Sequence, residues 1–246
     1  QSAVKKIFND SKIKEELNKE NIYLSSANSI NIGRLLPQIV YYFYSYKDLV
    51  KNKKIDAGEK ISFCVPTGNF GDILAGYYAK EMGLPVDKLV IASNDNNVLT
   101  DFFTTGTYDA NRDLVKTISP SMDILVSSNL ERLIFHKSSD DLVKEKMNDL
   151  RDKGVFDFEG DFKEFLCGYA NEDETRETIK KVFEEENYLI DPHTGVAKNI
   201  VDKLGLEKTV ILSTASPYKF SSTVLEALGE NLSDDEFENI NILHEK

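Results

Sequence analysis

The sequence predicts an α/β fold, a mostly parallel β-sheet with helices on both faces in three layers. Apolar, strand-like runs alternate with helix-like stretches nearly throughout the 246 residues. One run, residues 61–65, is followed by a glycine-rich loop, a helix and a second strand at residues 88–93, which is the building unit of such sheets. No repeat, low-complexity linker or clear domain break interrupts this alternation.

The composition excludes several classes of protein. With 41% hydrophobic residues, the chain can bury one large core or two modest ones. Its formal net charge of −12 repels nucleic acid and anionic membranes, so a bound anion needs local donors. In this acidic field, the aromatic run at residues 41–44 is expected to form core and helix-packing surface rather than stack on bases.

The sequence carries no sign of export, membrane insertion or metal binding. No apolar run reaches membrane-spanning length, and no signal peptide is visible. The two cysteines, Cys64 and Cys167, are too scattered to indicate a disulfide framework or a metal site. We therefore expect a cytoplasmic protein without a metal centre.

The first 60 residues predict two helices around a polar turn. Residues 2–20 are amphipathic, with a break near Asp10, and residues 22–24 are typical of a short strand. The polar turn at residues 25–31 leads into the second helix, in which Pro37 marks either a kink or the helix start.

The loop Pro66–Asp72 joins a strand to a helix at residues 73–82, which Gly83 and Pro85 bring to an end. Its two glycines allow a tight turn and leave main-chain N–H groups uncovered, and the helix start adds unpaired donors and a positive dipole end. A phosphate suits these donors. The pattern equally allows an ordinary turn in which Asp72 caps the helix.

Polar residues follow the next strands. Residues 94–97 place amide and carboxylate side chains at a strand end, where ligands bind in open α/β sheets, although a capped loop explains them equally well. Residues 104–113 predict a mobile surface loop and residues 123–126 a short strand. Residues 127–129 are expected to cap the next helix.

The charged stretch at residues 137–187 is expected to be mostly helical, with a turn near Gly160 and no chemical role. A brief strand at residues 188–190 precedes a turn that contains His193. Because no partner nucleophile is apparent, capping of the turn explains His193 better than catalysis does. The remaining elements are a strand at 209–212, a polar segment at 213–220 and a helix at 222–228.

Five groups of segments, taken together, carry a resemblance to a known family. They are Ser26–Asn31 with Arg34–Leu36, Pro66–Asp72, Ser93–Asn94 with Asn96–Asn97, Met122–Ile124 with Ser127–Arg132, and Thr214–Phe220. In this order they resemble threonine synthase, a pyridoxal-phosphate enzyme of the tryptophan-synthase-β-like, fold type II group. The resemblance spans nearly the whole chain.

The resemblance implies conversion of O-phospho-L-homoserine and water into L-threonine and phosphate, the last step of threonine biosynthesis. It also implies that Thr214 hydrogen-bonds the pyridine nitrogen of the cofactor. A neutral hydroxyl there keeps the ring a moderated electron sink, which suits chemistry that passes between the α, β and γ carbons. The cofactor phosphate is implied to bind Gly68, Asn69, Phe70, Gly71 and Asp72. We expect the Asp72 carboxylate to point away and cap the helix.

One segment of the family pattern is not found. The Schiff-base lysine of the family lies upstream of the Ser26–Asn31 stretch, between a phenylalanine and an aspartate. Lys163, which follows Phe162, lies on the wrong side of the phosphate loop and in a charged region. The resemblance therefore indicates a C-terminal portion with an incomplete sheet and no catalytic residue, inactive without its N-terminal part.

The resemblance also suggests a domain division and substrate contacts. Residues 1–30 would end a smaller α/β domain, and residues 31–246 would form the cofactor-phosphate-binding portion of the large domain, with the charged stretch near 137–187 as an insertion. Substrate contacts are expected from Asn28, Ser29, Arg34 and Lys219. A surface ion pair explains Arg34 equally well, and Lys219 could instead cap the preceding carbonyls.

Two other functions fit the same residues. The chain could be a stand-alone phosphoanion-binding or regulatory module, or part of a related pyridoxal-phosphate lyase or deaminase.

Overall fold

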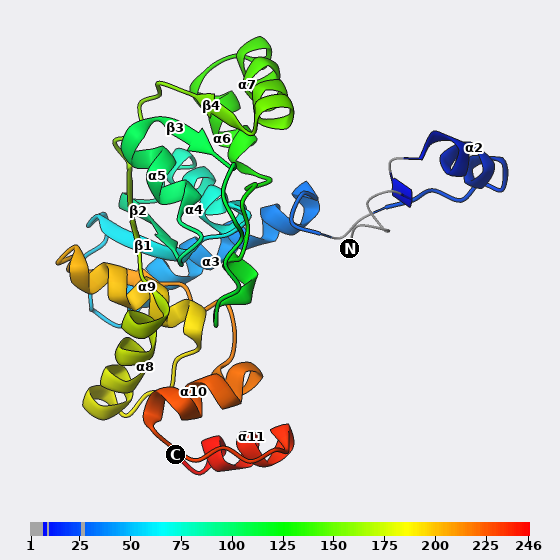
Figure 1. Cartoon of the computed structure of the whole chain (residues 1–246). Coiled ribbons are helices and arrows are strands. Elements are labelled where there is room, and N and C mark those ends of the chain that lie inside the picture. The colour runs from blue at the N-terminus through cyan, green and yellow to red at the C-terminus, as the bar shows by residue number, and fades with distance from the viewer. Residues whose placement is uncertain (1–6, 9, 26–27) are drawn as a thin grey trace.

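A four-stranded parallel sheet in the order β5-β2-β1-β6 lies at the centre of the fold (Figure 1). The computed structural model describes residues 7, 8, 10–25 and 28–246. The predicted α/β architecture with a parallel sheet is confirmed. The strands are β1 Ile61–Pro66, β2 Val86–Ser93, β5 Phe165–Tyr169 and β6 Thr209–Ile211. A separate antiparallel pair joins β3 Thr107–Asp109 to β4 Val155–Asp157.

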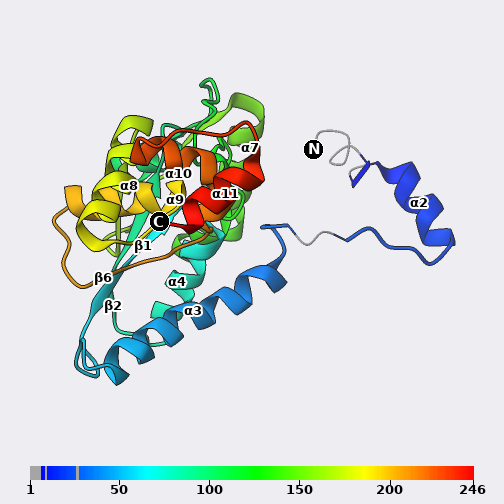
Figure 2. The same cartoon turned by 90° about the horizontal axis from the view of Figure 1, so that it is seen from below.

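Helices cover both faces of the sheet, because alternate residues of β1 enter different cores. Phe63 and Val65 belong to the larger core, with residues of four helices, whereas Cys64 packs against Ala197 and Ile200 on the other face. The first group consists of α3 Ile32–Lys51, α4 Gly71–Glu81, α5 Val98–Thr105 and α6 Leu130–Lys137. The opposite face carries α9 Pro192–Lys203, with α8 Glu172–Glu186 and α10 Ser221–Leu228 beyond it (Figure 2).

α3 packs closely against β1 and α4. The ring of Tyr42 lies 4.9 Å from that of Phe63, and a Cβ on Gly76 would approach the Tyr42 ring to 2.6 Å. Glycine at position 76 is therefore what lets the two helices approach. Of the aromatic run at residues 41–44, Tyr42 lies in the core, whereas Tyr41, Phe43 and Tyr44 are 55%, 36% and 66% exposed on α3.

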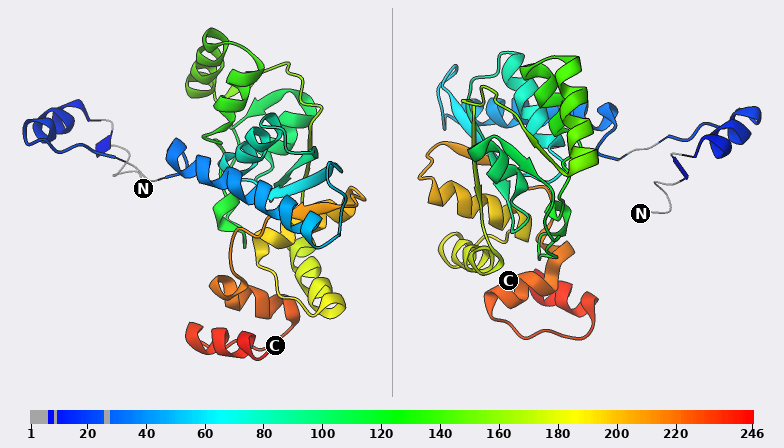
Figure 3. Two further views of the ribbon diagram at one scale, coloured as in Figure 1. Left: turned by 180° about the vertical axis from the view of Figure 1, so that it is seen from behind. Right: turned by 45° about the horizontal axis from the view of Figure 1, so that its top comes forward.

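The start of the described chain follows the expected break. Asp10 caps α2 Ser11–Lys19, with its side chain accepting from the main-chain N–H groups of Lys12 and Ile13. None of the α2 residues is buried, and the helix lies apart from the sheet in every view (Figures 1 to 3). The predictions for residues 2–6, 9, 26 and 27 lie outside the described residues.

Several predicted elements differ from the structure. α3 begins at Ile32 and contains Pro37, so the alternative start near Pro37 was wrong. Residues 22–24, 123–126 and 188–190 are not strands; η1, a short 3₁₀ turn at Pro120–Met122, lies before the second of these. Short apolar runs do not distinguish a strand from an extended loop that packs on a neighbour.

The charged stretch and the expected surface loop each contain strands. Besides α7 Asp140–Lys153 and α8, residues 137–187 contribute β4 and the sheet-edge strand β5. The loop at 104–113 contains β3, held by Tyr108, whose buried ring stacks on Phe156 at 5.2 Å. Pairing with a distant partner makes these strands, and no local period signals it.

The chain ends in two short elements. η2 Pro217–Phe220 precedes α10, and α11 Glu236–His244 packs on α10 through Leu243. In the part of the chain that the structure describes, no helix is long and apolar enough to cross a membrane.

Candidate functional site

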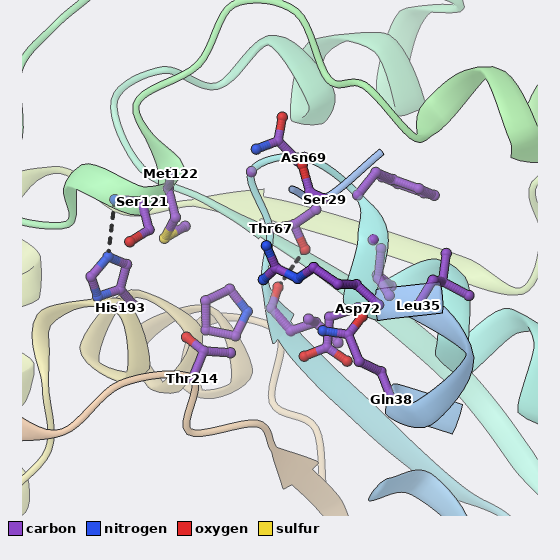
Figure 4. Close-up of a pocket in the computed structure, with 17 residues that line it drawn as sticks. Ser29, Leu35, Gln38, Thr67, Asn69, Asp72, Ser121, Met122, His193 and Thr214 are labelled. Carbon is purple, nitrogen blue, oxygen red and sulfur yellow. Dashed lines mark hydrogen bonds between the residues drawn. The ribbon is translucent and has the colours of Figure 1, made fainter. Parts of the chain in front are cut away.

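A cavity of ≈ 160 Å³ opens at the carboxyl end of β1 (Figure 4). This is the sheet edge at which ligands bind in open α/β folds. Segments distant in sequence meet there, from α3, the loop after β1, η1, the start of α9 and the loop after β6. Its lining residues are Ser29, Arg34, Leu35, Gln38, Val65–Ile73, Ser121, Met122, His193 and Thr214.

The loop after β1 turns sharply at Phe70. This residue stands at the N-cap position of α4 in the left-handed conformation, with φ 61° and ψ 5°. Such a backbone is unfavourable for a side chain larger than glycine. The Phe70 ring is fully buried and stacks on Phe103 at 5.8 Å between centroids. Burial of the ring holds the strained turn in place, and the turn starts α4 directly under the cavity.

The turn leaves a row of main-chain donors without partners among the described residues. No side chain caps α4, and no described residue accepts a hydrogen bond from the main-chain N–H groups of residues 68–73. These groups lie at the positive end of the helix dipole, beside the cavity. Unpaired N–H groups at a helix start bind anions, and phosphate most readily.

Gly68 is required by the close approach of a second segment. A Cβ at this position would lie 2.7 Å from the carbonyl oxygen of Ser121, whereas one at Gly71 would meet nothing nearer than the Asn129 amide at 3.5 Å. The predicted anion cradle at residues 68–72 therefore has donors that fit a phosphate and a floor, residues 121–122, that closes it on one side.

Residues 127–129 hold the cradle from behind. Ser127 donates from its hydroxyl to the Gly68 carbonyl at 2.8 Å. Asn129 donates to the Asn69 carbonyl both from its main-chain N–H, at 3.1 Å, and from its side-chain amide, at 2.8 Å. Asn129 occupies the N-cap position of α6, as expected of residues 127–129, but no side-chain cap hydrogen bond forms there. Their side chains position the phosphate loop instead.

The same asparagine connects the polar turn before α3. The Asn129 side-chain amide also donates to the Ser29 carbonyl at 3.0 Å, and Arg132 donates to the Ile30 carbonyl at 2.8 Å. Asn28 closes the turn itself, by accepting from the Ile30 N–H at 3.0 Å. Ser29 therefore reaches the cavity through contacts that lie 100 residues away in sequence.

Asp72 does not cap the helix, so that expectation was wrong. It lies inside α4 and lines the cavity, and the Tyr42 hydroxyl donates to its main-chain oxygen at 2.8 Å and to its Oδ1 at 3.3 Å. Burial raises the pKa of Asp72 to about 6, although the hydrogen bond from Tyr42 opposes the shift. A carboxyl that holds a proton close to neutral pH therefore lies beside the anion cradle.

The His193 ring connects the start of α9 to η1 rather than capping a turn. The cap of α9 is Asp191, which accepts from the His193 N–H at 2.9 Å. The His193 Nδ1 lies 2.8 Å from the Asp191 carboxylate, and its Nε2 accepts from the Ser121 N–H at 3.2 Å. These partners assign a neutral ring with the proton on Nδ1. Both ring nitrogens are occupied, so His193 has no nitrogen left to act as a base.

The Asp191 carboxylate is stabilised in its ionised form. It is fully buried, which raises its pKa, but hydrogen bonds from His193 and Thr194 outweigh burial and hold the pKa below its usual value. This network fixes the wall of the cavity on the α9 side.

The other predicted site residues are placed as follows. Ser29, Arg34 and Thr214 line the cavity; Asn28 supports the turn beside it. Lys219 is not among the lining residues, and its ammonium lies 5.4 Å from the centre of the Phe220 ring. The sequence reasoning did not find Gln38, Ser121 and Met122. Gln38 could have been found, because it lies four residues after Arg34 and thus on the same helix face.

Of the lining residues that the structure describes, Arg34 alone carries a fixed positive charge, and none is a lysine. The Lys163 side chain is 82% exposed, pairs with Asp161 at 2.8 Å and does not line the cavity. The arrangement can bind and orient an anionic ligand, but it offers no amine that could form a covalent bond with one.

Comparison with known proteins shows similarity to threonine synthases. The human protein named threonine synthase-like 1 is 45% identical over 240 residues, which is 93% of this chain and 32% of that protein. Threonine synthase of Saccharomyces cerevisiae is 40% identical over 254 residues, 93% of this chain and 48% of that enzyme. The chain thus spans half or less of the curated relatives it matches. No family model matches it.

Solved structures give the same result. A pyridoxal-phosphate-bound threonine synthase from Brucella melitensis matches with a TM-score of 0.85 and 38% identity, over 98% of this chain and 52% of that one. Yeast threonine synthase matches with a TM-score of 0.84 and 38% identity, over 97% and 50% of the two chains. The resemblance and the fold class predicted from the motifs are therefore confirmed.

Proposed function

We propose that this chain, similar to threonine synthases over about half their length, is the cofactor-phosphate-binding portion of a pyridoxal-phosphate-dependent threonine synthase. The observation that carries the proposal is the row of unpaired N–H groups at residues 68–73, which borders a cavity at the carboxyl end of β1. Similarity to a pyridoxal-phosphate-bound threonine synthase supports pyridoxal phosphate as the ligand.

The residues of this chain fit that ligand in two places. The main-chain donors of residues 68–72 would hold its phosphate, with Gly68 giving the loop room beside Ser121. Thr214, across the cavity, would hydrogen-bond the pyridine nitrogen by its hydroxyl. Pyridoxal phosphate, when bound, supplies an electron sink for amino-acid chemistry, and a neutral hydroxyl partner moderates it.

The proposed reaction is the conversion of O-phospho-L-homoserine and water into L-threonine and phosphate. Arg34 is the residue that would bind an anionic group of this substrate, since a guanidinium pairs well with phosphate and carboxylate. Ser29 would contact the substrate from the turn beside it, with Asn28 in support. Lys219 remains a candidate only if its side chain swings toward the cavity.

The amine that reacts with the cofactor is proposed to come from outside this chain. No lysine is found among the described residues that line the cavity. The isolated chain is therefore expected to bind pyridoxal phosphate but to catalyse no reaction. We also propose that the smaller domain ends at residue 30, that the large-domain portion begins at residue 31, and that the protein is cytoplasmic.

Two binding titrations test the phosphate cradle. Absorbance titration should show saturable binding of pyridoxal phosphate and much weaker binding of pyridoxal, which lacks the phosphate. Gly68→Asp should abolish the preference, because it adds bulk and negative charge to the cradle. The matched control is Asn241→Asp, which adds the same charge at an exposed position of α11 that does not line the cavity. Equal binding of both ligands would overturn the proposal.

The chemistry is tested in the full-length gene product. A reading frame that encodes a phenylalanine–lysine–aspartate segment upstream of residue 1 is required. The full-length protein should then release phosphate from O-phosphohomoserine. Release of ammonia from threonine or serine instead would identify a related lyase or deaminase, and no turnover of any of these would favour a binding module.

A further inference from the structure

Asp72 occupies an unusual place for a carboxylate in an anion site. It is the second residue of α4 and lines the same cavity as the unpaired N–H groups of residues 68–73. A negative charge in the first turn of a helix interacts with the same positive dipole end that would hold a phosphate. An ionised Asp72 and a bound anion would therefore compete for the same donors and repel each other.

One oxygen of Asp72 is left for a ligand. Tyr42 donates to Oδ1 at 3.3 Å, and no described residue forms a hydrogen bond with Oδ2. Oδ2 is not among the fully buried polar atoms that lack a partner, and Asp72 is one of the residues that line the cavity. A proton on Oδ2 would turn this oxygen from an acceptor into a donor that faces the anion.

Titratable and charged groups share the surroundings of Asp72. α3 contributes Tyr42 and Arg34, and α9 contributes His193, while the Cys64 thiol of β1 interacts with Tyr42. Burial raises the pKa of the Tyr42 hydroxyl and of the Cys64 thiol, so both stay protonated. Among the described lining residues, β2 and α6 place no charged side chain on the cavity.

We propose that Asp72 takes up a proton when the phosphate binds and donates a hydrogen bond to it from Oδ2. Asp72 is then a binding residue in its neutral form, whereas its ionised form would repel the anion. The inference rests on the proposed function, because it concerns the same cradle. It adds a requirement, since binding must consume one proton from solution.

Affinity for the anion should fall as the pH rises. Burial raises the pKa of Asp72 to about 6 in the unliganded chain, so above that pH a proton must be supplied for binding. Affinity should therefore fall about tenfold per pH unit above pH 6, as for any binding step linked to one proton. Below pH 6 it should level off, because Asp72 is already neutral.

Sulfate separates Asp72 from the ligand's own titration. A phosphate monoester has a second pKa near 6 and would itself give a pH dependence, whereas sulfate keeps its charge across this range. The experiment measures sulfate as a competitor of pyridoxal phosphate from pH 5.5 to 8, with the full chain and its Asp72→Asn variant. Circular dichroism checks that each variant is folded.

The expected results are distinct for each outcome. Sulfate affinity of the unmodified chain falls about tenfold per unit above pH 6, and that of Asp72→Asn stays flat, because its amide is a neutral donor at every pH. A flat profile in the unmodified chain, or the same slope in Asp72→Asn, overturns the inference. A folded Asp72→Asn that binds nothing also overturns it, since a neutral donor is then not sufficient.

Tyr42→Phe gives a second, independent test. Its hydroxyl lowers the pKa of Asp72, so removing it should move the midpoint of the sulfate profile to higher pH. An unchanged midpoint in folded Tyr42→Phe contradicts the inference. If neither pyridoxal phosphate nor sulfate binds the unmodified chain even at pH 5.5, the proposed function fails, which differs from binding without the pH dependence.

Discussion

Asn129 holds the carbonyl oxygen of Asn69 with two donors, its main-chain N–H at 3.1 Å and its side-chain amide at 2.8 Å. The same amide reaches the carbonyl of Ser29 at 3.0 Å. Asn129 is fully buried. One side chain therefore fixes both the phosphate loop and the turn before α3, and the shape of the cavity depends on it.

Replacing this side chain should loosen the cradle. Asn129→Ala is expected to lower the unfolding free energy by about 1–3 kcal/mol, because it removes the side-chain donor from the carbonyls of Asn69 and Ser29. Urea denaturation measures this loss, and affinity for pyridoxal phosphate should fall with it. Ser128→Ala is the control, since it leaves every bond to the Asn69 and Ser29 carbonyls and removes the 3.2 Å bond to the Asn69 side chain and a 3.5 Å bond from the Asn129 amide. Equal effects of the two changes would contradict the central role of Asn129.

Alanine should act oppositely at the two loop glycines. Gly68→Ala should destabilise the chain by about 1–3 kcal/mol, since its Cβ would press on the Ser121 carbonyl. Gly71→Ala, whose Cβ meets nothing closer than 3.5 Å, should be no less stable than the unmodified chain. Thermal unfolding of the two variants side by side measures the difference, and similar midpoints would show that the loop does not pack on Ser121 as described.

Because the backbone of Phe70 is left-handed, we expect glycine to destabilise the chain less than alanine does at this position. Phe70→Ala should lose about 3–5 kcal/mol through the missing ring. Phe70→Gly removes the same ring but relieves the strain at φ 61°, so it should be the more stable of the two by about 1 kcal/mol. Elsewhere in a fold glycine is normally the more damaging change. Denaturant titration of both variants decides, and a less stable glycine variant would refute the strained turn.

Asp191 predicts a loss of stability in acid. Its pKa is depressed in the folded chain, so its contribution is complete above the unfolded pKa of about 3.9 and is lost as the pH falls through the folded value. Asp191→Asn should cost about 1–3 kcal/mol at pH 7, because the buried His193 and Thr194 lose a charged acceptor. The difference from the unmodified chain should shrink below pH 4. A difference that is constant with pH would exclude an ionised Asp191.

Local patterns were sufficient to predict the fold class and the glycine-containing turn at residues 68–72, whereas anion binding there stays a prediction. Alternation of apolar runs and the two glycines around Phe70 are signals within a few residues, and both correspond to the observed structure. The supporting contacts were not predictable in this way. Asn129 meets Asn69 across 60 residues and His193 meets Ser121 across 72, and no periodicity records such pairs.

The wrong predictions for Asp72 and for β5 also arise because contacts distant in sequence leave no local pattern. Asp72 has the position in sequence of a helix cap, but the turn at Phe70 starts α4 earlier and places Asp72 within it. Lys219 lies in η2 and is not among the described residues that line the cavity, so its contact with the substrate stays a prediction. β5 was missed inside a charged stretch because its pairing with β2, and not its own composition, makes it a strand.

The most direct test of the central claim is phosphorus NMR of pyridoxal phosphate titrated with this chain. The account predicts a saturable change of the phosphate resonance with the unmodified chain, and no change with folded Gly68→Asp. If Gly68→Asp binds the phosphate as the unmodified chain does, the cradle at residues 68–72 is not the cofactor phosphate site.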